Sequence, residues 1–250
     1  MCAGHGLKVL ILQPFSNFEG WPTESQQRKD AFDRANGWID IMEAVGTDML
    51  QVGSSDSRDM SADTDRLAAD LASLADILAA RGFRLTYENW CWVTWAPKWK
   101  HAWDIVKKAD RSNIGLCLDT FQTAGGEWGD PTTKSGRSED GGISPDDLSK
   151  AYAASLNDLV KTIPSDKIYF VQISDAYYLD SPLDATADPE SGLRPRVQAV
   201  LSTGFQGWFS IEVFDGKFEE KYGAGLKKFA KKAMESYQRL LVEGSDSGSS

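Results

Sequence analysis

The sequence contains few of the residues that most metal sites and nucleophilic mechanisms use. It has three cysteines, at positions 2, 91 and 117, and two histidines, His5 and His101, in 250 residues. The cysteines are too few and too widely spaced for a disulfide framework or a structural zinc site, and we expect them to be reduced. Two histidines leave little room for a zinc hydrolase or a serine triad. Any metal bound by this chain is therefore expected to be held mainly by oxygen.

Long apolar runs and an excess of positive charge are also missing. The longest apolar run, residues 9–12, is far shorter than the ~18 residues of a membrane helix, and it follows no signal-peptide pattern. A net charge of −10 and a pI near 4.8 disfavour nucleic acid as a partner. With 41% hydrophobic and 26% charged residues, we expect a cytoplasmic globular protein that binds neither membranes nor nucleic acid.

Apolar, strand-like segments alternate with amphipathic, helix-like segments along the chain. Strands are predicted at residues 7–12, 48–52, 83–88, 114–120, 167–174 and 208–214, and helices at 23–45, 61–82, 99–109, 145–163, 197–202 and 226–242. Strands that each precede a helix are typical of βαβ units with a parallel sheet. The pattern predicts an α/β fold in one domain, residues 1–242, followed by a disordered polar tail at 243–250.

Oxygen-bearing side chains end four consecutive predicted strands. They are Glu88, Asp119, Gln172 and Glu212. The intervals between them fit βα units of ~30 residues plus two long connections, residues 121–143 and 176–196. Connections longer than ~12 to 15 residues are often functional, and α/β folds bind ligands at the carboxyl ends of their strands. The four side chains are therefore predicted on neighbouring strands, at the edge where such folds place their sites.

Carboxylates in apolar strands are costly unless they are paired or bind a cation. Ligands that are all oxygen favour Mn²⁺ or Mg²⁺, and Co²⁺ can also bind. The alternative is that each acid caps the next helix or pairs with Arg or Lys. That alternative is disfavoured for the whole set, because no matching set of basic residues lies on these strands. We predict a divalent metal site formed by Glu88, Asp119, Gln172 and Glu212.

Several segments, taken in order, resemble one known family. They are LQPF at 12–15, FEGW at 18–21, LQVGSSD at 50–56, YE at 87–88, GLCLDTF at 115–121, VQISD at 171–175 and GWFSIEVF at 207–214. Together they are similar to the xylose isomerase-like TIM-barrel superfamily of sugar phosphate isomerases and epimerases, and within it to the fungal 3-dehydroshikimate dehydratase-like group. The resemblance implies a TIM barrel whose divalent metal ligands fall at the four strand-end residues.

The resemblance also implies an activity. Dehydratases of this group convert 3-dehydroshikimate to protocatechuate, whereas other branches interconvert sugars, and both chemistries pass through an enolate-like intermediate of a polarised ketone. By the same resemblance, Glu88 and Glu212 can transfer protons. We expect a metal-dependent lyase that acts on a small polyhydroxylated carbonyl compound. A sugar isomerase or epimerase, and a catalytically inactive barrel that serves as a binding protein, remain the alternatives.

The chain departs from the family pattern in three places. A TIM barrel closes with eight strands and six are predicted here, so about two βα units are expected to be missing at the amino end. The open strand edge that this leaves is expected to favour a homo-oligomer, aggregation or pairing with another segment. The connection after Gln172 is shorter than in related chains. Gln122 stands where bacterial dehydratases tend to have a histidine.

Substrate contacts are predicted from two tryptophans and two arginines near these strand ends. Trp90 and Trp92 lie just after Glu88 in the sequence, and aromatic faces suit ring substrates. Arg194 and Arg196 carry planar guanidinium groups that suit a substrate carboxylate, although they can equally be ordinary loop charges.

Overall fold

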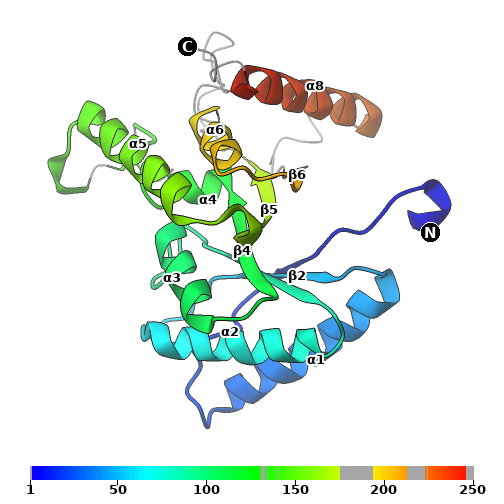
Figure 1. The fold of residues 1–250 in the computed structure, drawn as a ribbon. Coiled ribbons are helices and arrows are strands. Elements are labelled where there is room, and N and C mark those ends of the chain that lie inside the picture. Colours follow the sequence, from blue (N-terminus) through cyan, green and yellow to red (C-terminus); the bar gives the residue numbers. More distant parts are fainter. Residues whose placement is uncertain are drawn as a thin grey trace. The chain divides into compact units, whose positions relative to one another are not determined.

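A computed structural model describes residues 2–130, 133, 135–138, 140–174, 194–212, 223 and 225–245. Six strands form one sheet in the order in which they occur along the chain (Figure 1). They are β1 (Leu12–Phe15), β2 (Met49–Gly53), β3 (Arg84–Glu88), β4 (Ile114–Asp119), β5 (Ile168–Ile173) and β6 (Trp208–Ile211). The first four strands pair in parallel. Sequential parallel strands separated by helices confirm the predicted α/β organisation with six βα units of the TIM-barrel type.

The chain divides into two compact units. The first contains Met1–Leu118 and Asp166–Phe170, and the second contains Asp119–Ser165 and Val171–Ser250. The helices of the first are α1 (Gln26–Val45), α2 (Thr64–Ala79) and α3 (Trp99–Ala109), after a 3₁₀ turn at Cys2–His5. Those of the second are α4 (Thr120–Gly125), α5 (Pro145–Thr162), α6 (Arg194–Ser202) and α8 (Leu226–Ser245), with a 3₁₀ turn at Asp140–Gly142. A further 3₁₀ turn, Ser165–Lys167, precedes β5.

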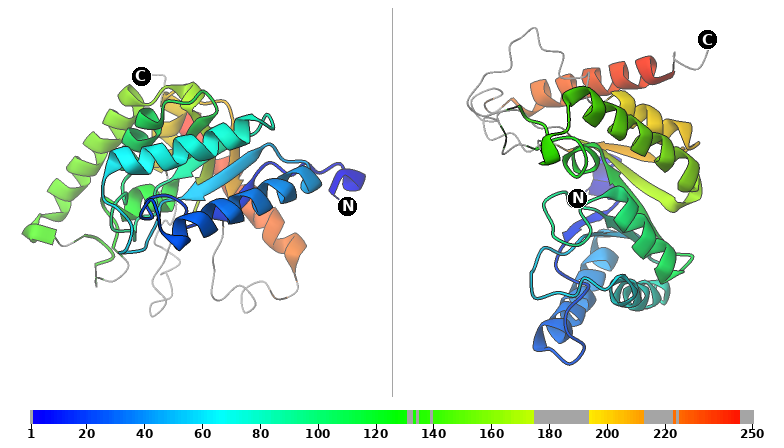
Figure 2. Two further views of the ribbon diagram at one scale, coloured as in Figure 1. Left: turned by 90° about the horizontal axis from the view of Figure 1, so that it is seen from below. Right: turned by 90° about the vertical axis from the view of Figure 1, so that its left-hand side faces the viewer.

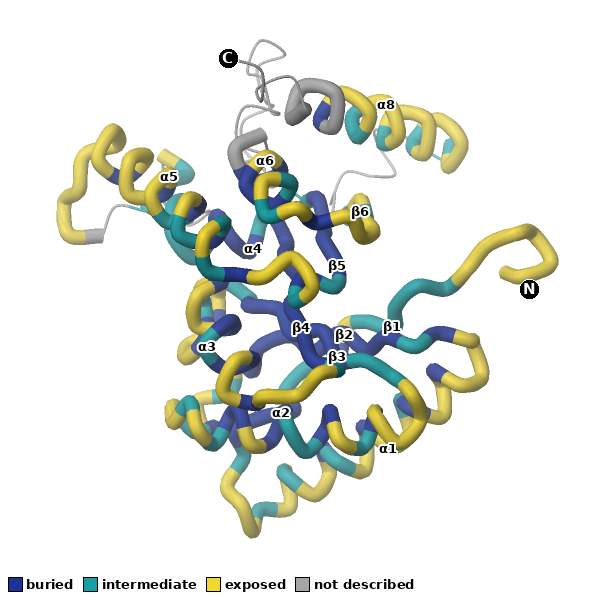
Figure 3. The backbone as a smooth tube through the Cα atoms, in the orientation of Figure 1, coloured by how far each residue is buried: buried dark blue, intermediate teal, exposed yellow. Residues whose placement is uncertain are grey.

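The core of the first unit lies where its helices cover the sheet. The four leucines predicted to share one face of α2 are all buried, namely Leu67, Leu71, Leu74 and Leu78. That helix packs beside α3 and against β3 (Figure 2). Every residue of β2 is buried, as Figure 3 shows in dark blue. Each buried leucine contributes about 2 kcal/mol through the hydrophobic effect, so α2 is held by its apolar face.

Local signals set the ends of the helices. Ser25 caps α1, where its Oγ accepts a hydrogen bond from the Arg28 N–H at 3.1 Å, two residues after the predicted start. The helix ends before Gly46, whose φ of 74° is left-handed and therefore favours glycine. Ser144 caps α5 in the predicted way, with Pro145 in the first turn. The bounds of α3 agree with the prediction.

The first strand is displaced from its predicted position. Pairing with β2 begins at Leu12, opposite Leu50, and the register shifts before Phe15 lies opposite Val52. Residues 7–11 precede the strand, and Leu7 is 63% exposed. The apolar residues Leu10 and Ile11 instead pack against a cluster formed by Met49, Cys117 and Phe170. The prediction of a buried strand is therefore wrong for residues 7–11, of which 7 and 8 are exposed and 9–11 are only partly buried.

Two apolar clusters form the core of the second unit. Ala124, Tyr152, Leu156 and Ala199 make one, and Ile173, Val197 and Leu240 make the other. Through them α6 packs against both α5 and α8. The last helix continues to Ser245, three residues into the segment predicted as a tail. Residues 175–193 and 213–222, which include most of one predicted loop and the end of a predicted strand, lie outside the described residues.

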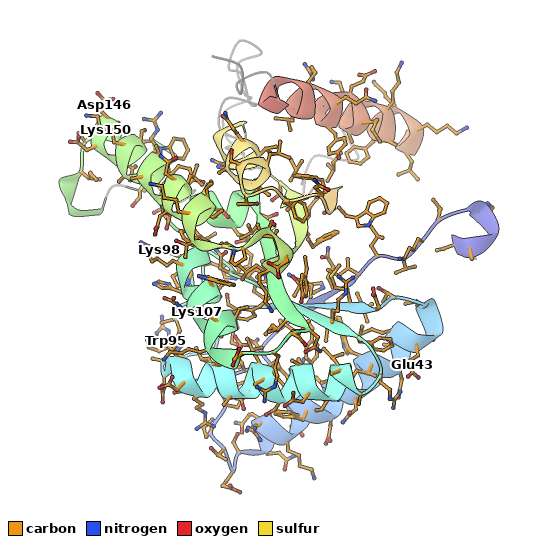
Figure 4. The ribbon with its side chains drawn as sticks, viewed as in Figure 1. Glu43, Trp95, Lys98, Lys107, Asp146 and Lys150 are labelled. Carbon is orange, nitrogen blue, oxygen red and sulfur yellow. The ribbon has the colours of Figure 1, made fainter. Side chains whose placement is uncertain are left out.

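Charged side chains occupy the outer faces of the helices. Figure 4 labels Glu43 on α1 and Lys107 on α3 in the first unit, and Asp146 and Lys150 on α5 in the second, all of which project away from the helices. Within the described part of the chain, no helix has the length and apolar character needed to cross a membrane.

Candidate functional site

Glu88 ends β3 and is 3% exposed. Its Oε2 accepts a hydrogen bond from Nε2 of Gln51 on β2 and another from Nε1 of Trp90 at 2.9 Å. In the register of these strands Gln51 lies opposite Thr86 and Gly53 lies opposite Glu88. Side chains two residues apart point to the same face of a strand, so Gln51 reaches the carboxylate across that face. The first unit thus holds a carboxylate at a strand end in a fixed orientation.

Sequence reasoning missed a second buried carboxyl in the same unit. Glu19 lies between β1 and α1, and its Oε1 accepts hydrogen bonds from the Ser55 N–H at 2.9 Å and from the Tyr87 hydroxyl at 2.8 Å. No described residue provides a partner for its Oε2. Burial raises the pKa of Glu19 to about 7, although these hydrogen bonds oppose the shift. The available signal was an acid between aromatic residues, in Phe18-Glu19-Gly20-Trp21.

Asp119 ends β4 and caps α4 in the second unit. Its Oδ1 accepts the Gln122 N–H at 2.8 Å, and its Oδ2 accepts the Ser174 hydroxyl. Burial raises the pKa of Asp119 to about 6, against the lowering effect of these hydrogen bonds and of the positive charge of Arg196. The helix-capping alternative is therefore confirmed at this position. The cap uses Oδ1, and Oδ2, which accepts the Ser174 hydroxyl, has a further lone pair that a cation can use. Capping alone does not explain the burial.

Gln172 and Glu212 lie at the strand ends predicted for them. Gln172 is 1% exposed in β5, and Glu212 directly follows β6 and is partly buried. The Glu212 N–H donates to the Ile173 carbonyl at 3.0 Å, which ties the two strand ends together. Burial and the negative charge of Asp119 raise the pKa of Glu212 to about 7, while a hydrogen bond with the Gln172 side chain lowers it. Asp119, Gln172 and Glu212 therefore interact within one unit.

The donors of the second unit fit a hard cation. Burial raises the pKa of both Asp119 and Glu212, and the negative charge of Asp119 adds to the shift of Glu212. A divalent cation would compensate these negative charges, and Gln172 adds an amide oxygen. Within the residues that the structure describes, no three His, Cys, Asp or Glu side chains form a metal-binding group. The described residues thus bring together two carboxylates and one amide, Asp119, Glu212 and Gln172, without a third carboxylate in the group.

Arg196 lies in the first turn of α6 and is 5% exposed. Its Nε donates to the Tyr152 hydroxyl at 3.1 Å, and the guanidinium carbon lies 5.8 Å from the centre of that ring. Its Nη1 is buried, and no described residue accepts a hydrogen bond from it. An ordinary charged residue of a surface loop would be exposed, whereas the Arg196 side chain is buried. Arg194 begins the same helix, but its side chain is not among the described ones.

The two predicted tryptophans stack on each other beyond β3. The ring centres of Trp90 and Trp92 are 5.4 Å apart with an angle of 28° between the planes. Trp92 is 58% exposed and leaves one aromatic face open to solvent, whereas Trp90 is partly buried and bonded to Glu88. The open face of Trp92 is suited to stacking with a planar ligand.

Comparisons with known proteins identify relatives along nearly the whole chain. A family model described as xylose isomerase-like TIM barrel matches residues 1–235. A 3-dehydroshikimate dehydratase of Neurospora crassa is 29% identical over 97% of this chain and 74% of that protein. One from Pseudomonas aeruginosa is 33% identical over 87% of this chain, which corresponds to 31% of its own length.

A solved structure shows the same fold. The xylose isomerase-like TIM barrel/4-hydroxyphenylpyruvate dioxygenase fusion protein matches with a TM-score of 0.65 and 27% identity, over 90% of this chain and 34% of that protein. This chain therefore spans about a third of the fusion protein and of the Pseudomonas relative. The resemblance found in the sequence motifs is confirmed. Because the family model matches most of its length, the chain belongs to the xylose isomerase-like TIM-barrel family.

Proposed function

We propose that this chain is a lyase that dehydrates 3-dehydroshikimate to protocatechuate with the help of a divalent cation. The proposal is carried by the interacting acids Asp119 and Glu212, which lie at strand ends and are buried enough that their pKa values are raised, a setting suited to a cation. Relatives named 3-dehydroshikimate dehydratase, at 29% and 33% identity, support the choice of substrate.

The proposed ligands are Glu88, Asp119, Gln172 and Glu212. The last three interact within the second unit, and Glu88 is included from the sequence, where it ends the strand that precedes the strand of Asp119. Oxygen donors favour Mn²⁺ or Mg²⁺, with Co²⁺ as a substitute. When bound, the cation would polarise the substrate ketone and so acidify the adjacent C–H bond.

The chain's own residues would move the protons and hold the substrate. The reaction takes a proton from the carbon next to the ketone and expels a hydroxyl group as water, so a base and an acid are required. Glu88 and Glu212 are the proposed proton carriers. Arg196 is the proposed partner of the substrate carboxylate, because its Nη1 is buried and no described residue accepts from it. Trp90, Trp92 and Arg194 remain sequence-based predictions for substrate contact.

Metal binding and turnover are measured separately on the purified chain. Electron paramagnetic resonance measures Mn²⁺ binding by the wild type, by Asp119→Asn and by Glu212→Gln, with the exposed Asp146→Asn as the matched control. We expect binding that is lost in both site variants and kept in the control. The appearance of aromatic absorbance after 3-dehydroshikimate is added then measures turnover.

Two outcomes contradict the proposal. A chain that is folded by circular dichroism but binds no Mn²⁺ favours the inactive, binding-protein alternative. Exchange of a substrate α-proton with solvent, with no aromatic product, favours an isomerase or epimerase.

A further inference from the structure

Two side chains donate hydrogen bonds to the Glu88 carboxylate. Two donors from different segments, Gln51 Nε2 and Trp90 Nε1, converge on the same oxygen, Oε2. Gln51 is 1% exposed and Glu88 is 3% exposed. A carboxylate whose one oxygen accepts two hydrogen bonds in a buried setting loses most of its freedom to rotate. Gln51 and Trp90 therefore help to set its orientation.

Gly53 provides the space that Trp90 occupies. It is the residue of β2 directly opposite Glu88. A Cβ atom built on Gly53 would overlap the indole carbons Cζ2 and Cε2 of Trp90. The φ angle of Gly53 is not left-handed, so the requirement for glycine at this position is steric rather than conformational. Any side chain here would displace the indole from the position in which it donates to Glu88.

The backbone beside Glu88 is fixed by Ser54. The Ser54 N–H donates to the Glu88 carbonyl at 2.8 Å, and its Oγ accepts the Trp90 N–H, also at 2.8 Å. Ser54 is fully buried. The end of β2 thus holds the backbone at both ends of the Glu88–Trp90 segment, and the Trp92 ring stacks on the ring of Trp90. Trp90 is therefore restrained by its backbone, by Gly53 beneath it and by a neighbouring ring.

We propose that Trp90, seated on Gly53, and Gln51 are positioning residues that orient the Glu88 carboxylate for a divalent cation. Donors to a metal-binding carboxylate fix which lone pairs it presents, and losing one such partner typically weakens metal affinity by about 10- to 100-fold. The inference rests on the proposed function, since it assigns Trp90 a role toward Glu88 rather than toward substrate alone. Gly53 and Trp90 act together, because the indole can occupy this position only if residue 53 has no side chain.

The test measures Mn²⁺ affinity by electron paramagnetic resonance in three variants. Trp90→Phe keeps an aromatic ring over Gly53 but removes the donor, Gln51→Met removes the other donor at similar volume, and Gly53→Ala displaces the ring. We expect each to bind Mn²⁺ about 10- to 100-fold more weakly than the wild type. Trp208→Phe and Gly37→Ala are matched controls, because Trp208 is 61% exposed and a Cβ on Gly37 meets nothing within 4 Å.

A second readout separates positioning from a loss of packing. In ¹H–¹⁵N spectra of the tryptophan indoles, the signal missing from Trp90→Phe identifies Trp90, and Glu88→Gln should shift that signal while the Trp208 signal stays in place. In the Glu88→Gln background, Trp90→Phe should cause no further loss of Mn²⁺ affinity. Circular dichroism establishes that every variant is folded, and the Trp90→Phe result decides the matter if Gly53→Ala does not fold.

The outcomes distinguish this inference from the proposed function. A wild type that binds no Mn²⁺ overturns both. A wild type that binds Mn²⁺ and dehydrates 3-dehydroshikimate, with unchanged Mn²⁺ affinity in Trp90→Phe and Gln51→Met, overturns the positioning role alone. An additive effect of Trp90→Phe in the Glu88→Gln background also overturns it, because Trp90 would then act without Glu88.

Discussion

Replacing the buried Glu19 with glutamine should change how the stability of the chain depends on pH. Burial raises the pKa of Glu19 from 4.5 to about 7. The folded chain therefore binds this proton more tightly than the unfolded chain does. The contribution to stability is fully present below pH 4.5, declines as pH rises toward 7 and is absent above it, for a total of about 3 kcal/mol. Glutamine does not titrate and removes this dependence.

Urea unfolding at several pH values measures the effect. The free energy of unfolding of Glu19→Gln relative to the wild type should rise by about 2 kcal/mol between about pH 5.5 and pH 8. Any cost of burying the new amide is the same at both pH values, so the change with pH isolates the carboxyl. The exposed Glu24→Gln is the control, and its difference should vary by less than about 0.5 kcal/mol. A difference for Glu19→Gln that is equally flat would refute the reasoning.

Further predictions concern the buried Asp70, the core of the first unit and the metal. Asp70 accepts a hydrogen bond from the Gly20 N–H at 3.0 Å and pairs with Arg28 at 2.8 Å. Asp70→Ala should therefore lower the free energy of unfolding, measured in urea, by about 3 kcal/mol, and a loss under about 1 kcal/mol would contradict this. Leu74→Ala, at a fully buried position in α2, should cost about 2 to 5 kcal/mol in the same assay. Mn²⁺ at about 100 times its dissociation constant should stabilise the wild type by about 2.7 kcal/mol, an effect that EDTA reverses and that Asp119→Asn lacks; equal stabilisation of that variant would argue against the ligand set.

The elements that could be predicted are those in which several local signals agree. In α5 a serine cap, a proline in the first turn and an amphipathic pattern coincide, and the predicted and observed helices differ by one residue at the end. The strand-end positions of Glu88 and Asp119 were predictable for a similar reason. A buried parallel strand is a continuous apolar run, and the first charged residue after that run marks its carboxyl end. The apolar runs in the sequence thus locate candidate metal ligands at strand ends, even though they do not show which residues contact those ligands.

Prediction failed where pairing or tertiary burial decides the outcome. Residues 7–11 are as apolar as a strand, but hydrogen bonding with β2 begins only at Leu12. The sequence predicts Arg196 as either a substrate contact or a loop charge, and only the packing of α6 against α5 shows that its guanidinium is buried beside Tyr152. Both are questions about neighbours that are distant in sequence, which a hydrophobic pattern does not encode.

In the environment of Glu88, the sequence predicts which residues share a face of a strand, but not the register between strands. The alternation of a strand places Gln51 and Gly53 on one face of β2, which the sequence alone reveals. What it does not reveal is the register that sets Gly53 opposite Glu88. A slip of one residue would turn Gln51 to the other face and place a side chain beneath the Trp90 indole. Because both donors to Glu88 depend on that one register, a substitution that weakens the pairing of β2 with β3 should reduce metal affinity even when it touches neither donor.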